Sequence, residues 1–218
     1  MSAVAAPRRL PSIAPYALPG EDELPPSRAD WVLAPDRAAL LVHDMQRYFV
    51  DAFTPDAEPI AGIVRNIAAL TEAARARGLP IFYTAQNGDQ DRRDRGLQAD
   101  LWGPGMRHVA EHQPIVDPLA PQPGDIVLVK HRYSAFQRSN LETLMRARGR
   151  DQLVICGVYA HIGCLATASE AFQRDIHPFF AADALGDFSR GWHDKALALV
   201  ANCSGVVRST RQLIEALS

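Results

Sequence analysis

The sequence predicts a three-layer α/β/α protein with a parallel, doubly wound central sheet. From residue 38 onwards, short and almost continuously apolar segments alternate with segments of helical periodicity. Such apolar runs are typical of strands buried on both faces, as in a parallel sheet covered by helices. The 218 residues suffice for one such domain. We expect an extended, Pro- and Ala-rich arm over residues 1–34 and one folded domain over residues 35–218.

The first half of the domain predicts two strands separated by a long helix. Residues 38–43 form a short apolar run that ends at an acid, Asp44. Over residues 59–78 apolar side chains recur at helical spacing, and Gly78 stands where such a helix would end. Residues 80–85 are apolar again and predict the second strand.

The second half continues the alternation. Residues 125–130 predict a third strand, and Ser139, followed three residues later by Glu142, is a plausible start for a helix that closes at Gly149. The remaining strands are expected at 152–157, 179–183 and 205–209, with helices at 162–174, 189–202 and 210–217.

One long connection, residues 86–124, lacks a regular pattern. A connection of this length in a compact domain is usually functional. In open parallel sheets, ligands bind beyond the carboxyl ends of the strands. Asp44, Gln86, Lys130 and Tyr159 all lie at or just past expected strand ends. We therefore expect these polar residues to meet at one edge of the sheet and form a binding site.

Composition excludes several classes of protein. The formal net charge of −2 argues against sequence-independent nucleic-acid binding, although a local basic cluster could still bind a small anion. No apolar run reaches the length of a membrane span, and the N-terminus lacks the apolar core of a signal peptide. Cys156, Cys164 and Cys203 are scattered and form no C-x-x-C pair. They indicate free thiols in a cytoplasmic protein.

A set of short motifs connects this chain with a known family. The motifs are 43–49 (HDMQRYF), 83–86 (YTAQ), 94–97 (DRGL), 102–105 (WGPG), 132–136 (RYSAF), 157–163 (GVYAHIG), 182–185 (ADAL) and 187–189 (DFS). In these motifs, and from about Pro15 to the C-terminus, the chain resembles the isochorismatases of the isochorismatase-like cysteine hydrolase superfamily. The resemblance implies the isochorismatase-like hydrolase fold.

The resemblance also implies an activity. The family's hydrolases cleave the enolpyruvyl ether of isochorismate or of 2-amino-2-deoxyisochorismate, releasing pyruvate and a trans-dihydro-hydroxylated benzoate or anthranilate for siderophore or phenazine biosynthesis. The sequence leaves both substrates open. A homodimer, an anionic small-molecule substrate, no cofactor, and downstream dehydrogenase or carrier-protein enzymes are implied in the same way. Because the chain stops at Ser218, we expect no aryl carrier domain.

Gly163 stands where the cysteine hydrolases of this superfamily carry their nucleophile. The acid and the lysine that accompany the nucleophile are present as Asp44 and Lys130. An acid without a nucleophile points to proton transfer rather than acyl transfer. We expect Asp44 to protonate the vinyl carbon, with its pKa raised by the bound substrate. We expect Lys130 to pair with Asp44 and with a substrate carboxylate.

Four further residues are candidates for holding the substrate. Arg95 in the long connection would bind a carboxylate, although a solvated charge among Arg92, Arg93 and Asp94 is a serious alternative on sequence alone. Gln86 would bond a carboxylate or a ring hydroxyl. Tyr159 and the backbone N–H of Gly163 lie at a strand-to-helix turn, where amides favour an anion. Aromatic residues would wall the pocket, namely Trp102 with Tyr48 or Phe49.

Two other functions remain open. Cys164 could act as a nucleophile one place late, as in an amidase of the nicotinamidase type, but one residue along a helix turns a side chain by about 100°. A catalytically silent partner module is the second alternative, and the joint presence of the polar candidates speaks against it. We expect no metal site, because His43 and Asp44 should point to opposite faces of a strand. His161 has no obvious partner and is interpreted as structural.

Overall fold

Six parallel strands form one sheet in the order β3–β2–β1–β4–β5–β6. The computed structural model describes residues 10–218. The strands are β1 (Ala38–His43), β2 (Ile81–Ala85), β3 (Ile126–Val129), β4 (Gln152–Val158), β5 (His177–Gly186) and β6 (Val206–Arg208). The helices are α1 (Arg47–Val50), α2 (Ile60–Ala76), α3 (Arg92–Arg95), α4 (Gln98–Trp102), α5 (Leu141–Arg146), α6 (Leu165–Gln173), α7 (Arg190–Cys203) and α8 (Thr210–Leu217).

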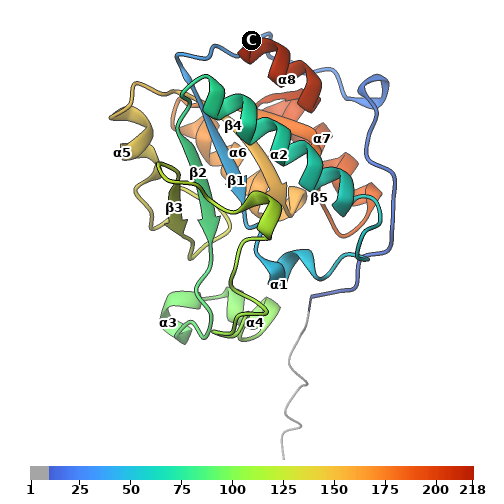
Figure 1. Ribbon diagram of the computed structural model, residues 1–218, viewed down its shortest axis with the longest axis vertical. Helices are drawn as coiled ribbons and strands as arrows, with labels where there is room; N and C mark the ends of the chain where they lie inside the picture. The colour runs from blue at the N-terminus through green and yellow to red at the C-terminus, as the bar shows by residue number, and fades with distance from the viewer. Residues whose placement is uncertain (1–9) are drawn as a thin grey trace, which may run out of the picture.

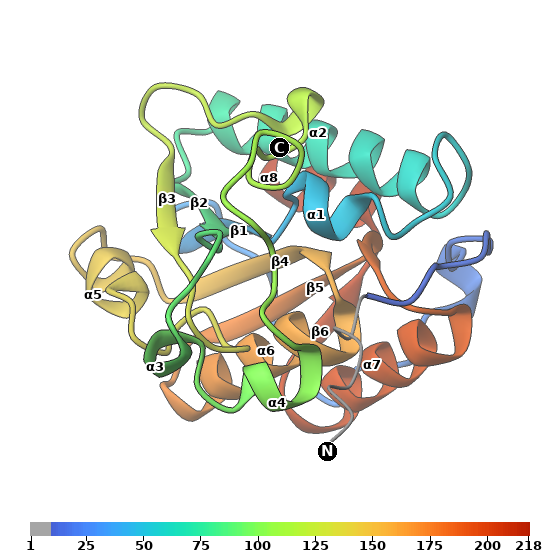
Figure 2. The same ribbon diagram turned by 90° about the horizontal axis from the view of Figure 1, so that it is seen from below.

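The helices cover both faces of the sheet, so the predicted three layers are confirmed (Figures 1 and 2). Helices α1, α2 and α8 lie on one face, and α5, α6 and α7 on the other. Strand β1 shows why: Leu40 and Val42 pack in the first core, whereas Ala39 and Leu41 pack in the second. Alternate side chains of a strand point to opposite faces, so a central strand of this sheet must be apolar throughout.

The chain reverses its direction of winding between β1 and β4. Strands β2 and β3 add on one side of β1, and β4, β5 and β6 follow on the other. The carboxyl ends of β1 and β4 therefore flank the crevice in which such sheets bind ligands. Figure 2 looks onto this end, where α1, α3 and α4 lie.

Three elements differ from the sequence expectation. The segment expected as a helix from residue 162 begins as a π-helical turn, Ala160–Cys164, before α6. Strand β5 runs over His177–Gly186 and is longer than expected, and its pairing with β4 shifts register between Ile155 and Gly157. The connection 86–124 contains α3, α4 and a short 3-10 helix, Asp117–Leu119.

Residues 10–34 run along the outside of the domain with little regular structure (Figure 1). Ile13 is buried and forms a bridge with Phe53. Further along, the Trp31 ring stacks on His177 with a centroid separation of 4.3 Å. These contacts hold the segment against the domain, and Leu10 reaches the pocket described next.

Candidate active site

Asp44, the first residue after β1, is almost completely buried. Its backbone adopts φ +52°, which turns the chain out of the strand. Thr84 in β2 holds Asp44 twice: Asp44 N–H donates to Thr84 Oγ1 (3.0 Å), and the Thr84 hydroxyl donates to Asp44 Oδ1 (2.6 Å). One carboxylate oxygen is thereby fixed to the sheet, which leaves Oδ2 for other partners.

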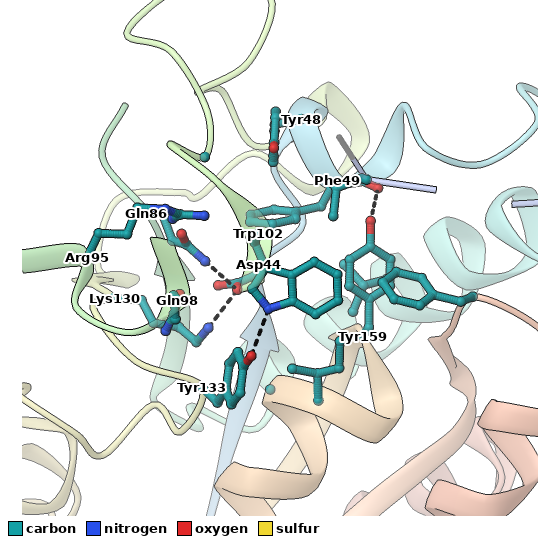
Figure 3. A pocket seen from close by; sticks show the side chains of 16 residues that line it. Asp44, Tyr48, Phe49, Gln86, Arg95, Gln98, Trp102, Lys130, Tyr133 and Tyr159 are labelled. Atoms are coloured by element: carbon teal, nitrogen blue, oxygen red, sulfur yellow. Dashed lines mark hydrogen bonds and ion pairs between the residues drawn. The ribbon is translucent and has the colours of Figure 1, made fainter. Parts of the chain in front are cut away.

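Lys130 and Gln86 meet Asp44 at Oδ2 (Figure 3). The Lys130 Nζ donates to Oδ2 at 2.8 Å and Gln86 Nε2 at 3.4 Å. Burial alone would raise the pKa of the Asp44 carboxyl, but the nearby Lys130 ammonium and the Thr84 hydroxyl outweigh it, so the pKa lies below its ordinary value. Asp44 is therefore an ionised partner of Lys130 in the free protein.

Gln46 ties the segment after β1 to the long connection. Its Oε1 accepts from Gln86 N–H at 2.7 Å, and its Nε2 donates to Gln86 O and to Gln113 O at 2.9 and 2.7 Å. Gln46 is 1% exposed. It thus positions the backbone that presents Gln86. Sequence reasoning missed this role, although Gln46 lies inside motif 43–49, which carries part of the family likeness.

Arg95 is a buried cation rather than a solvated loop charge, with 6% of its surface exposed. Its Nε donates to Gly103 O at 2.6 Å. The guanidinium packs on Gly105, where a Cβ would lie 2.5 Å from Arg95 Nη1, so only glycine leaves it room. No carboxylate within residues 10–218 forms an ion pair with it, and burial lowers its pKa. The pocket therefore presents one uncompensated positive charge.

The pocket is lined by every predicted site residue. Trp102, Tyr48 and Phe49 form aromatic walls (Figure 3). The Tyr159 hydroxyl donates to Phe49 O at 2.8 Å, so this residue offers the pocket its ring rather than a free hydroxyl. Residues that the sequence reasoning did not select also line it: Leu10, Gln98, Gly105, Tyr133, Val158, Ile162 and Phe188.

Two of these additional residues could have been found. Tyr133 and Phe188 lie inside motifs 132–136 and 187–189, which carry the family likeness. The Tyr133 hydroxyl accepts from Trp102 Nε1 at 2.7 Å, which fixes the indole as a wall. Gln98 lies on α4 and its Nε2 donates to His131 O at 3.4 Å. No pattern in the sequence marks it.

Comparison with known proteins assigns the chain to a family. Residues 38–212 match the model of the isochorismatase domain. Enterobactin synthase component B of Escherichia coli (strain K12) is 48% identical over 95% of this chain and 73% of its own length. The phenazine biosynthesis protein PhzD of Pseudomonas fluorescens is 47% identical over 94% of this chain and 98% of its own. The chain belongs to the isochorismatase family.

A cysteine hydrolase from Pseudomonas syringae pv. phaseolicola 1448A shares the family's fold. Its structure superposes with a TM-score of 0.77 and 27% identity, covering 88% of this chain and 97% of the other. The isochorismatase-like α/β fold expected from the sequence is thereby confirmed. Within that fold, Gly163 lines the pocket here and has no side chain with which to attack a substrate.

Cys164 is not placed to contact a ligand in this pocket. It is fully buried and does not line the pocket. Burial in an apolar core raises the pKa of its thiol well above the ordinary value. A buried thiol with a raised pKa and no contact with the pocket is poorly placed to act as a nucleophile on a ligand there.

The expectation that His43 and Asp44 point apart is wrong. His43 Nδ1 lies 3.8 Å from Asp44 Oδ2, because Asp44 has already left the strand and the alternation of side chains no longer applies. His161 also has a partner: its Nδ1 lies 2.5 Å from Asp187 Oδ1, and its ring stacks on Trp192.

Two negative findings concern residues 10–218. No three His, Cys, Asp or Glu side chains of this range come together as metal ligands would. None of its helices combines the length and the apolar character needed to cross a membrane.

Proposed function

We propose that this protein hydrolyses an enolpyruvyl ether of the isochorismate type by proton transfer from Asp44 to the vinyl carbon. Isochorismate hydrolysis in secondary metabolism follows from membership in the family and from relatives named for enterobactin and phenazine biosynthesis. The observation that carries the mechanism is the Asp44–Lys130 ion pair in a pocket that also holds Arg95, which forms no ion pair within residues 10–218.

The charges of the pocket support a substrate with two carboxylates. In the free protein Lys130 is neutralised by Asp44, and Arg95 is left without an anion among the described residues. A dianion would offer one carboxylate to Arg95 and the other to Lys130. Asp44 would then face an extra negative charge and share its ammonium partner, so its pKa would rise and it would take up a proton. Substrate binding would thus protonate Asp44.

Protonation of carbon is the difficult step, and protonated Asp44 would lie beside the bound substrate. Asp44 transfers its proton to the terminal methylene carbon of the vinyl ether, which becomes a methyl group. The C=C electron pair forms the new C–H bond, and the ether oxygen stabilises the cation as an oxocarbenium ion. A positioned acid of this kind contributes about 10²–10⁴-fold to the rate.

Water completes the reaction and restores Asp44. It adds to the oxocarbenium carbon and gives one proton to the Asp44 carboxylate, forming a hemiketal. The hemiketal then collapses: its hydroxyl becomes the ketone of pyruvate as the C–O bond to the ring breaks, and the proton goes to the departing ring oxygen. No covalent bond to the protein forms at any stage, so no nucleophilic side chain is required.

Gln86 and the aromatic residues have supporting roles in this proposal. The Gln86 amide already donates to Asp44 Oδ2 and can stay bonded to either protonation state of the carboxyl. The rings of Trp102, Phe49 and Tyr159 provide an apolar wall for the cyclohexadiene ring. An apolar wall also strengthens the charge interactions by excluding water.

Incubating the protein with isochorismate and with 2-amino-2-deoxyisochorismate, and measuring pyruvate, tests the proposal. We expect pyruvate from one or both, with a deuterium atom in its methyl group when the reaction runs in heavy water. Pyruvate without deuterium would exclude protonation of carbon by an exchangeable acid. No pyruvate from either substrate would contradict the function itself.

Three further properties belong to the proposal. We expect a homodimer from the family likeness, to be checked by analytical ultracentrifugation. Three free thiols fit a reducing compartment, so we expect a cytoplasmic location. Dehydrogenase or carrier-protein enzymes would act on the ring product, which carries two substituents that a dehydrogenase can oxidise.

A further inference from the structure

The imidazole of His43 packs directly on Gly163. A Cβ added to Gly163 would lie 2.3 Å from His43 Cε1, 3.1 Å from Nε2 and 3.2 Å from Nδ1. Carbon atoms that are not bonded normally stay about 3.5 Å or more apart. The ring of His43 therefore occupies the space that any side chain at position 163 would need.

His43 cannot easily leave this space. The residue is completely buried at the end of β1. Its Nδ1 donates to Val158 O at 3.0 Å, and its Nε2 lies 3.3 Å from Thr167 Oγ1. The Thr167 hydroxyl itself donates to Gly163 O at 2.7 Å. The ring is thus held by the hydrogen bond from Nδ1, while Nε2 only packs against the Thr167 oxygen, whose proton goes to the carbonyl of the glycine on which the ring packs.

The same ring borders the proposed acid. Nδ1 of His43 lies 3.8 Å from Asp44 Oδ2, the oxygen that Lys130 and Gln86 contact. Burial lowers the pKa of His43 to about 4, so the ring is neutral near pH 7 and does not compete with Lys130 as a charge partner. A neutral, fixed ring at this distance limits the positions that the carboxyl can take.

We propose that His43 is the positioning residue that commits this site to proton transfer: its ring fills the place of a side chain at residue 163 and holds the Asp44 carboxyl towards the pocket. This inference rests on the proposed role of Asp44 as the acid. On this inference, glycine is needed at position 163 because the ring of His43 leaves no room for a side chain there. A nucleophile at position 163 and an imidazole at position 43 exclude each other sterically.

A double-variant cycle tests this coupling. His43→Asn retains an amide that can donate to Val158 O but is too short to reach the position of Cε1. Gly163→Ala introduces the clashing Cβ. Both single variants and the double variant would be assayed for pyruvate release at a temperature where thermal unfolding shows all proteins folded. Gly191→Ala, on α7, has no atom closer than 4.0 Å to the added Cβ and serves as the matched glycine control.

We expect His43→Asn to lower kcat about tenfold or more while KM changes less than about threefold, because the carboxyl loses its orientation but the cations remain. Gly163→Ala should lower kcat at least as much. The double variant should be no worse than His43→Asn alone, because the clash is gone. If Gly163→Ala fails to fold, recovery of a folded double variant would show the same rescue.

Independent effects in the cycle, with the double variant losing the product of the two single losses, would overturn the coupling. A His43→Asn enzyme that keeps kcat within about twofold would overturn the positioning role, whether or not the glycine variants fold. Asp44→Asn in the same assay separates this inference from the proposed function. If Asp44→Asn retains turnover, Asp44 is not the acid and the proposed function fails. If Asp44→Asn is inactive but the effects in the cycle are additive, only the proposed role of His43 fails.

Discussion

The Nζ of Lys130 lies 2.8 Å from Oδ2 of Asp44, and both side chains are at most 6% exposed. A buried ion pair of this kind contributes little to stability on balance, because the two charges lose their hydration. Its effect on the chemistry is larger. In the proposed mechanism, Asp44 stays ionised beside Lys130 until a substrate carboxylate competes for the ammonium.

Asp44→Asn should bind substrate and scarcely turn it over. The amide keeps the shape of a protonated carboxyl but cannot deliver a proton to carbon, so we expect kcat to fall by about 10²-fold or more. Binding should tighten or stay equal, since a negative charge facing a dianion has been removed. Single-turnover kinetics and calorimetric titration measure the two effects separately. A variant that retains most of its kcat would exclude Asp44 as the acid.

Lys130→Met should lower kcat/KM by roughly tenfold to a hundredfold through the loss of a charge-assisted contact. The variant should also change the pH dependence of kcat/KM on its alkaline side. With the ammonium gone, burial dominates and raises the pKa of Asp44, so the acid stays protonated to higher pH. We therefore expect the alkaline decline of kcat/KM to shift upwards relative to the wild type. A decline at the wild-type pH would contradict the coupling between the two residues.

Arg95→Ala should raise KM and leave the fold intact, because the guanidinium has no anionic partner of its own among the described residues. A loss of about tenfold to a hundredfold in kcat/KM is the expected size for one charge-assisted contact. Arg93→Ala, two residues away and exposed, is the matched control and should behave as wild type. Equal kinetics for both variants would remove Arg95 from the binding site.

Cys164→Ala should keep most of the activity, and thiol reagents should leave the native enzyme active. Cys164 and Cys156 are buried, whereas Cys203 is exposed and should account for the labelling by iodoacetamide. Peptide mass spectrometry after brief alkylation identifies the modified residue. Inactivation that parallels labelling of Cys164 would restore a cysteine mechanism.

The stability of the protein should decline between pH 6.5 and pH 4. Burial holds the pKa of His43 near 4, whereas the unfolded chain binds that proton at about 6.5. The unfolded state thus binds more protons in this window, and stability rises with pH across it, by about 3 kcal/mol from His43. Urea unfolding of wild type and of His43→Asn at several pH values measures the difference. An unchanged slope in the variant would contradict this assignment.

The sequence predicted the sheet well because each strand contains a short, nearly continuous apolar run. It also placed Asp44 and Lys130, because the end of a strand can be read from its apolar run. It could not decide whether Arg95 was buried. That depends on Gly103 and Gly105 of the same loop, which fold back around the guanidinium, and loop conformation leaves no periodic signal.

The role of His43 was also beyond reach of the sequence pattern. Strand alternation placed it away from Asp44, and this would hold if Asp44 continued the strand. The positive φ of Asp44 turns its side chain away from the direction that continued alternation would give. An Asp can adopt a positive φ at modest cost, but no neighbouring residue in the sequence predicts it.

Lys130 follows β3 and Arg95 ends α3, so the two cations belong to separate segments, and in the proposed mechanism each would hold one end of the substrate. Such bivalent anchoring lasts only while the ligand is a single molecule. Cleavage of the ether divides a dianion into two monoanions, each retained by one cation. Each product then dissociates on its own, and Asp44, once more ionised, reclaims Lys130. In the proposed mechanism, the chemical step would therefore weaken the binding of its own products.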